Sequence, residues 1–241
     1  MKNILDKHVG AYQGNNIYDF DNKIMLNWYS SRIIELSKGS SSLLELGLGH
    51  GFTTSNFSKY FKRHVVLDGS RSVIGNFKKN YPECKAELIE TFFENFESDE
   101  KFDIVVMGFI LEHVKNPSEI LTRFKKYLNP NGSLFISVPN AEALNRRLGN
   151  TAGFLSDLHE LSQNDLLLGH LRFYTVTSLA GEVKNAGYNI KSIEGIYLKP
   201  FTTKQIISLN FDEKIINALC QVGISYPELS ASILLHAKEN S

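Results

Sequence analysis

Short apolar runs alternate with longer amphipathic segments through the first part of the chain. Apolar runs that end in Gly, Asp or Asn predict buried strands at about 42–46, 65–68, 86–89, 102–107 and 133–138. Apolar positions at helical spacing between them predict helices at about 52–61, 71–79 and 117–128. Pro117 suits a first helical turn, and the Asn-Pro-Asn-Gly sequence at 129–132 predicts a stop and turn. This alternation predicts an α/β fold with a parallel sheet and helices on both faces.

Segments on either side of this core complete the predicted outline. Residues 21–37 have Ile24, Trp28, Ile33 and Leu36 spaced for an amphipathic helix, so residues 1–38 are expected to form a helical cover. Tyr12 and Tyr18 lie in a polar segment that fits either a lid or a frayed tail. After the core come an insertion at 139–176, a helix at 177–186, strands at 188–196 and 232–237, and an apolar helical face over 203–222. With no repeats or linkers, residues 1–241 are expected to form a single domain.

A glycine-rich loop follows the first predicted strand. Gly47, Gly49 and Gly51 alternate with Leu48 and His50 just before a predicted helix. Glycines there allow close approach of the backbone to a ligand, and the helix start favours negative charge. Such a loop alone is weak support for any one ligand. Glu45, two residues before the first glycine, favours a cationic ammonium or sulfonium ligand over a pyrophosphate.

A second acidic residue, Asp68, ends the next predicted strand, where a carboxylate can accept both hydroxyls of a ribose. The sequence resembles the class I S-adenosylmethionine-dependent methyltransferases in several blocks that keep the family's order. These blocks are the glycine loop with Glu45, Asp68, and residues 102–107, 111–114, 128–138 and 169–174. Within that family the chain is most similar to small-molecule enzymes of the sugar and natural-product type.

The resemblance implies a Rossmann-like seven-stranded sheet, mostly parallel, with strand order 3-2-1-4-5-7-6. It also implies S-adenosylmethionine as the cofactor and S-adenosylhomocysteine as the product. The residues expected to bind the cofactor lie on the loops after the first four strands. They are Glu45, Gly47, Gly49, Gly51, Asp68, Gly69, Glu90, Phe92 and Met107.

Candidate residues for the methyl acceptor lie after the fourth strand and in the insertion. His113 and His170 are the candidate catalytic residues, because a hydroxyl acceptor needs a base. Structural roles in a loop or turn remain open for both. His159, Arg172 and Tyr174 are candidate acceptor ligands, since arginine can form paired bonds with a carboxylate or phosphate.

Composition excludes several other classes. The chain has 26 Lys and Arg against 26 Asp and Glu, so its net charge gives no support for a nucleic-acid partner. No run is long enough to span a bilayer and no signal peptide is evident. Cys84 and Cys220 are too few for a disulfide framework or zinc site, so a cytoplasmic protein is expected. No metal is expected, although ligands from distant segments remain open, as does a homodimer.

The sequence therefore predicts methyl transfer to a small polar acceptor, with a hydroxyl of a sugar or natural-product intermediate favoured. Two alternatives remain: an N-methyltransferase for an amino sugar or amino acid, and a regulatory protein that binds S-adenosylmethionine without turnover. A DNA-amine methyltransferase is disfavoured, because Met107-Gly108-Phe109-Ile110 replaces the Asn/Asp-Pro-Pro-aromatic motif of those enzymes.

Overall fold

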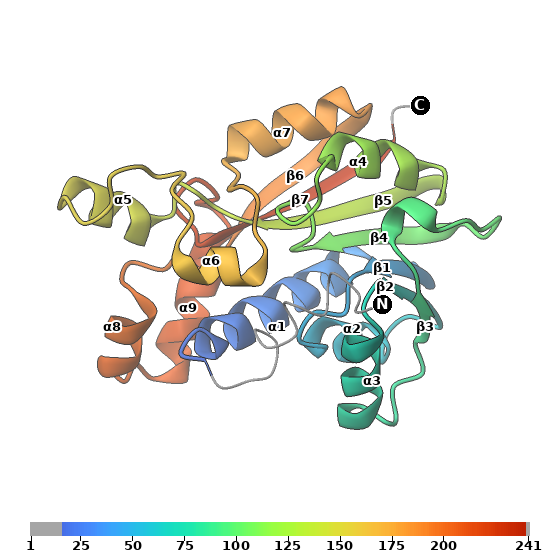
Figure 1. The fold of residues 1–241 in the computed structure, drawn as a ribbon, viewed down its shortest axis with the longest axis horizontal. Coiled ribbons are helices and arrows are strands. Elements are labelled where there is room, and N and C mark those ends of the chain that lie inside the picture. Colours follow the sequence, from blue (N-terminus) through green and yellow to red (C-terminus); the bar gives the residue numbers. More distant parts are fainter. Residues whose placement is uncertain (1–15, 240–241) are drawn as a thin grey trace.

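The computed structural model describes residues 16–239 and places seven strands in one sheet (Figure 1). The order across the sheet is β3-β2-β1-β4-β5-β7-β6, which confirms the predicted topology. β7 pairs antiparallel with β5 and β6, and the other pairings are parallel. The strands are β1 (Ser42–Leu46), β2 (Arg63–Asp68), β3 (Glu87–Glu90), β4 (Phe102–Gly108), β5 (Leu128–Pro139), β6 (Tyr188–Ile196) and β7 (Ser232–Glu239).

Helices cover both faces of the sheet, as predicted. α1 (Asp19–Leu36), α2 (Phe52–Phe57) and α9 (Glu213–Gly223) pack on one face, while α4 (Pro117–Lys125) and α7 (Val176–Asn185) pack on the other. α3 (Arg71–Asn80) packs beside β2 through Ile74 and Phe77. The remaining helical elements are the 3₁₀ turn η3 (Phe93–Asn95), α5 (Leu144–Thr151), α6 (Gln163–Leu168) and α8 (Thr203–Ser208).

Period-two alternation in β1 directs its side chains into the core on both faces of the sheet. Leu44 and Leu46 join the apolar cluster under α4 and α7, whereas Leu43 joins the cluster under α1 and α2. Glu45 points to the same face as Leu43, because successive side chains in a strand alternate. All four residues are buried, so β1 is the centre of the core and fixes the loop that follows it.

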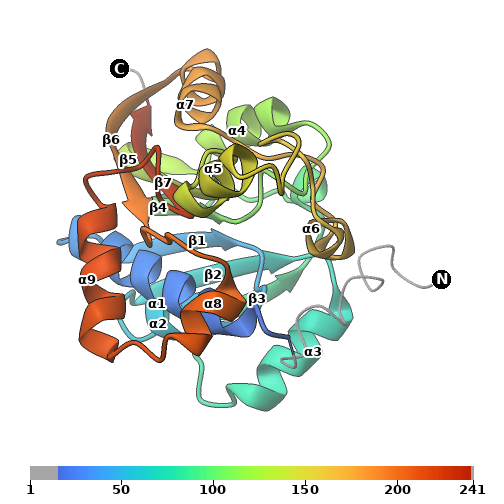
Figure 2. The same ribbon diagram turned by 90° about the vertical axis from the view of Figure 1, so that its left-hand side faces the viewer.

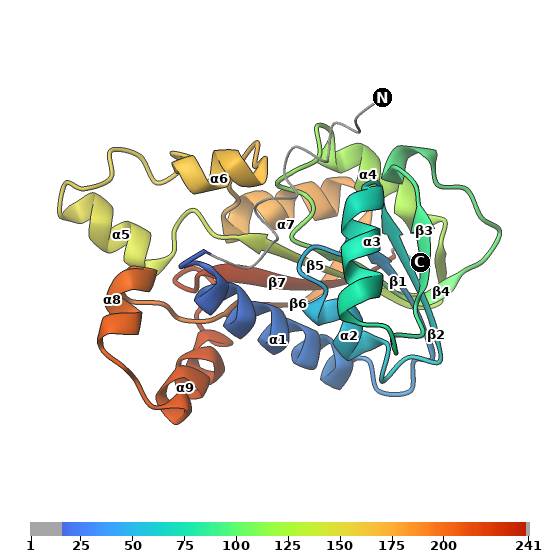
Figure 3. The ribbon, with the colours of Figure 1, turned by 60° about the horizontal axis from the view of Figure 1, so that its bottom comes forward.

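The start of α1 and the expected insertion lie around one end of the sheet. α5 and α6 lie beyond the carboxyl ends of β1 and β4, and α8 lies nearby (Figures 1 and 3); Figure 2 looks onto that end. The start of α1 is bound to this region: Lys199 Nζ lies 2.5 Å from Asp21 Oδ2, and Asn16 Nδ2 donates to Asn164 Oδ1 at 3.2 Å. The part of the expected cover before residue 16, with Tyr12, lies outside the described residues.

Two local predictions were wrong. The apolar face expected over 203–222 is two helices, because Asn210 adopts a left-handed φ of 46° and Asp212 caps α9 by accepting from Lys214 N. The turn expected at 129–132 lies inside β5, where the pairing with β4 shifts register and Asn131 has φ 67°. In both places a residue that tolerates the left-handed region interrupts the regular element.

No helix within residues 16–239 is long and apolar enough to cross a membrane.

His236 of β7 is a half-buried imidazole for which we expect a pH-dependent effect on stability. It stacks on Phe135 with ring centroids 4.5 Å apart, and its Nε2 lies 3.0 Å from Ser133 Oγ. Burial, helped by Lys238 and Lys191, lowers its pKa to about 4 from an ordinary value of 6.5. The folded protein therefore binds this proton less readily than the unfolded chain between those pH values.

We expect this histidine to reduce the free energy of unfolding as pH falls from 6.5 towards 4. His236→Gln should lessen the slope over that interval by at most about 1.4 kcal/mol per pH unit, the limit for one proton. Urea denaturation at several pH values between 4 and 6.5 measures this slope. The control is His159→Gln, which changes an exposed histidine. An unchanged slope in His236→Gln would contradict the assignment.

Candidate functional site

The glycine loop between β1 and α2 has the conformation that its sequence requires. Gly47, Gly49 and Gly51 have φ values of 81°, 47° and 80°, a region that other residues rarely adopt. A Cβ at Gly47 would lie 2.6 Å from Ile110 Cδ1, and one at Gly51 would lie 2.6 Å from the Phe77 ring. A Cβ at Gly49 would meet nothing within 4 Å, so this part of the backbone faces open space. The loop is thus packed against Ile110 and Phe77 at Gly47 and Gly51, and it is accessible to a ligand at Gly49.

Glu45 binds the protein itself. Its Oε1 accepts from Thr53 Oγ1 at 2.8 Å, and its Oε2 accepts from Thr54 Oγ1 at 2.9 Å and lies 2.9 Å from His64 Nε2. The carboxylate is 2 % exposed and joins β1 to α2 and β2. This geometry favours a role in orienting the loop over direct contact with a ligand ammonium.

Asp68 ends β2 and anchors the same loop from the next strand. Oδ2 accepts from Leu48 N at 2.9 Å and Oδ1 accepts from Ser70 N at 2.7 Å. Burial raises the pKa of Asp68, and these two backbone bonds oppose that shift. Each oxygen has a second lone pair, so the carboxylate can still accept ligand hydroxyls. Gly69 follows Asp68 directly and is buried.

The other expected cofactor residues lie on adjacent strand ends. Glu90 is the last residue of β3, pairs in register with Asp68 and is exposed. Phe92 follows it with a ring that is 42 % exposed. The Met107 side chain, by contrast, is fully buried in the apolar core, and its expected part in binding the cofactor stays a prediction. Gly108 ends β4 instead, and a Cβ there would collide with the hydroxyl of Tyr29 on α1.

The two candidate catalytic histidines meet although they are far apart in sequence. Their rings are edge to face with centroids 4.7 Å apart, and His170 Nδ1 lies 3.1 Å from Asp165 Oδ1. Burial alone would raise the pKa of Asp165, but bonds from His170 and Ser162 lower it overall. The histidines therefore form one polar cluster between the β4–α4 loop and the end of the insertion.

Glu112, which sequence reasoning did not single out, completes this cluster. Its carboxylate, His113 and His170 each place a ligand atom within 4.8 Å of the others. Burial raises the pKa of Glu112 to about 8, opposed in part by Arg172. The signal for Glu112 in the sequence is its position between two apolar residues, Leu111 and Val114, next to His113.

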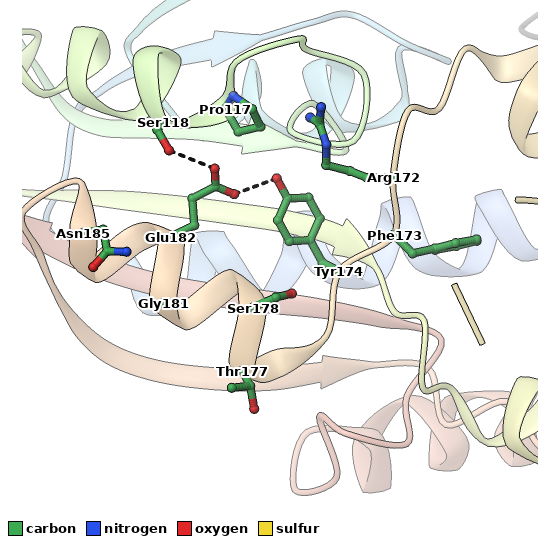
Figure 4. A pocket seen from close by; sticks show the side chains of 10 residues that line it. All are labelled: Pro117, Ser118, Arg172, Phe173, Tyr174, Thr177, Ser178, Gly181, Glu182 and Asn185. Atoms are coloured by element: carbon green, nitrogen blue, oxygen red, sulfur yellow. Dashed lines mark hydrogen bonds between the residues drawn. The ribbon is translucent and has the colours of Figure 1, made fainter. Parts of the chain in front are cut away.

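Arg172 and Tyr174 each bind other groups of the protein, and their expected role as acceptor ligands stays a prediction. The Arg172 guanidinium donates to the carbonyls of Leu111 at 2.9 Å and Val114 at 2.5 Å. The Tyr174 hydroxyl donates to Glu182 at 2.8 Å, and Glu182 also accepts from Ser118 (Figure 4).

These contacts border a groove of about 530 Å³ between α4 and α7, on the opposite face of the sheet from α1 (Figure 4). His159 lies exposed on the loop between α5 and α6, and its acceptor role stays a prediction.

Comparison with known proteins agrees with this arrangement. The family described as "Methyltransferase domain" matches residues 23–193. The chain is 29 % identical over 132 residues to the mitochondrial ubiquinone biosynthesis O-methyltransferase of Dictyostelium discoideum, covering 49 % of this chain and 41 % of the relative. It is 30 % identical over 111 residues to the ubiquinone biosynthesis O-methyltransferase of Pasteurella multocida, covering 41 % and 46 %. The chain thus spans less than half the length of these two curated relatives.

Solved structures share the whole fold. The N-methyltransferase NodS of Bradyrhizobium japonicum WM9, in complex with S-adenosylhomocysteine, matches with a TM-score of 0.64 at 12 % identity and 98 % coverage of both chains. The plantazolicin methyltransferase BpumL, in complex with a triazolic desmethylPZN analogue and S-adenosylhomocysteine, matches with a TM-score of 0.65 at 17 % identity, covering 98 % of this chain and 97 % of that one. At these identities the likeness concerns the fold.

Proposed function

Because this chain belongs to the methyltransferase-domain family and has the class I fold, which uses S-adenosylmethionine, we propose that it methylates an oxygen of a small polar acceptor. The acceptor is a hydroxyl of a sugar, phenol or natural-product intermediate. The observation that supports oxygen most directly is the cluster of Glu112, His113 and His170 beside the carboxyl end of β4. A hydroxyl must lose its proton to become a good nucleophile, whereas a neutral amine need not.

The cofactor in this proposal lies across the carboxyl ends of β1, β2 and β4, where open α/β sheets bind ligands. Asp68 accepts the ribose hydroxyls, and Glu90 and Phe92 border the adenine. Gly47, Gly49 and Gly51 leave room for the methionine portion. Glu45 contributes by fixing the loop through Thr53, Thr54 and His64. When bound, the cofactor supplies the methyl group.

The acceptor pocket in this proposal lies between α1 and the 139–176 insertion. Ile110, two residues before Glu112, borders Gly47, so the polar cluster lies close to the methionine end of the loop. The segment that leads into α1 is linked to the insertion by the hydrogen bond between Asn16 and Asn164. Alignment of acceptor and methyl can by itself contribute roughly 7–11 kcal/mol in the best cases. The free thiols of Cys84 and Cys220 are consistent with a reducing compartment, which we take to be the cytoplasm.

The test compares oxygen and nitrogen acceptors with the same variants. Purified protein, labelled S-adenosylmethionine and a panel of phenols, sugars and amino sugars are combined, and the products are identified by mass spectrometry. His113→Ala and His170→Ala should each lower transfer to oxygen by roughly 10²- to 10⁴-fold, the usual contribution of assisted proton transfer.

Transfer only to nitrogen, with a rate that follows the amine's own pKa and is insensitive to both variants, would favour the N-methyltransferase alternative. Cofactor binding without turnover of any acceptor would favour the regulatory alternative.

A further inference from the structure

Glu112 is a buried acid whose carboxylate has no hydrogen-bond partner among the other residues that the structure describes. It is fully buried, and neither carboxylate oxygen accepts a hydrogen bond from any other residue within 16–239. The nearby Arg172 does not fill this role, because its guanidinium donates to the carbonyls of Leu111, Val114 and Lys115. A buried carboxylate without a partner is strongly unfavourable unless a proton or a cation neutralises it.

The groups that face Glu112 are nitrogen ligands. One ring nitrogen of His113 and one of His170 lie within 4.8 Å of each other and of a Glu112 carboxylate oxygen. Two imidazoles and one carboxylate form a donor set typical of Zn²⁺, Fe²⁺ and Mn²⁺ sites in proteins.

The protein backbone holds these ligands together before any ion binds. Leu171, the residue after His170, donates from its backbone N–H to the Glu112 carbonyl at 2.8 Å. Arg172 binds the carbonyls on either side of Glu112 and His113. Two segments far apart in sequence are therefore fixed against each other at the cluster. Folding already brings the ligands together, so ion binding does not have to order them.

Asp165 adds the outer contact that metal-binding histidines usually have. Its Oδ1 lies 3.1 Å from His170 Nδ1, and its Oδ2 accepts from Ser162 N at 2.8 Å as part of the cap of α6. A carboxylate on Nδ1 leaves Nε2 as the atom available to an ion and fixes the ring orientation.

We infer that Glu112, His113 and His170 form a binding site for one divalent transition-metal ion, with Asp165 orienting His170. Three protein ligands leave coordination positions for a water or an acceptor hydroxyl. The part that the ion would play in methyl transfer rests on the proposed function. In that reaction the two histidines act as ligands of the ion.

The ion would lower the pKa of an acceptor hydroxyl, as bound metals do for water. The hydroxyl proton passes to solvent, an oxygen lone pair forms the new C–O bond, and the C–S bond breaks with its electrons on sulfur. The products are the methyl ether, S-adenosylhomocysteine and one proton, so the step needs no oxidant or reductant.

The test measures metal binding directly, without cofactor or acceptor. Chelator-treated protein is titrated with Zn²⁺ and with Mn²⁺ by calorimetry, and bound metal is counted after gel filtration. We expect one ion per chain for at least one of the two metals. Glu112→Gln and His170→Asn should each weaken binding at least tenfold, and Asp165→Asn by about 10- to 100-fold.

Matched controls are Glu119→Gln and His159→Asn, which change exposed residues of the same types and should bind the ion as the wild type does. Circular dichroism checks that each variant folds. No stoichiometric binding of either metal by the wild type, or undiminished binding by folded Glu112→Gln and His170→Asn, would overturn the site. Metal binding together with no methyl transfer would contradict the proposed function while leaving the metal site standing.

Discussion

Replacing Glu45 with alanine should lower the free energy of unfolding by about 3–5 kcal/mol, the range for removing one partner from a buried charged network. The reason is its three contacts, with Thr53, Thr54 and His64, all in the buried interior. Without the carboxylate, two hydroxyls and an imidazole are left buried without their acceptor. Urea denaturation followed by circular dichroism measures this loss.

Glu45→Gln is the informative companion variant. Glutamine keeps the shape and one acceptor oxygen, so we expect it to lose less stability than Glu45→Ala. If Glu45 acted mainly by binding a ligand ammonium, both variants would keep their stability and lose cofactor affinity to similar extents. Near-wild-type unfolding of Glu45→Ala would therefore contradict the positioning role.

Asp68→Ala should weaken binding of S-adenosylhomocysteine by about 10- to 150-fold, since a hydrogen bond to a charged group contributes roughly 1.5–3 kcal/mol. The loss includes the ribose contact and the anchor on Leu48 N. Asp103→Ala is a matched control, because Asp103 also accepts backbone bonds, from Ser41 and Ser42, but at the amino end of β4. It should lose stability and retain affinity.

A ribose analogue separates the two contributions of Asp68. Wild-type protein should bind S-adenosylhomocysteine more tightly than its 2′-deoxy analogue, and Asp68→Ala should bind both alike. The same preference in Asp68→Ala as in the wild type would show that this carboxylate does not contact the ribose.

The parts of the site that follow strand ends could be predicted from the sequence. The glycine loop and Asp68 lie next to apolar runs of a few residues, and the order of strands fixes which loops share an edge. Local sequence is sufficient there, because the φ values of the glycines and the end of β2 depend on near neighbours. Asn210, which tolerates the left-handed region, and Asp212, a residue type that caps helices, are local signals that divide the 203–222 segment into two helices.

The acceptor side could not be predicted in the same way. Glu112 and His170 belong to segments that only the tertiary structure brings together. Arg172 resembles an anion ligand in sequence, yet its donors are used by backbone carbonyls, a pairing that no side-chain pattern reveals. Met107 lies at the correct strand end, but its side chain points into the core. Local patterns thus determine where a loop lies and long-range packing determines which groups face the ligand.

Calorimetric titration of the wild-type chain with S-adenosylhomocysteine is the most direct test of whether the loops after β1 and β2 bind the cofactor. We expect one binding site per chain with micromolar affinity, weakened by Asp68→Ala and retained by Asp103→Ala. A folded wild-type protein that binds neither S-adenosylhomocysteine nor S-adenosylmethionine would contradict this expectation.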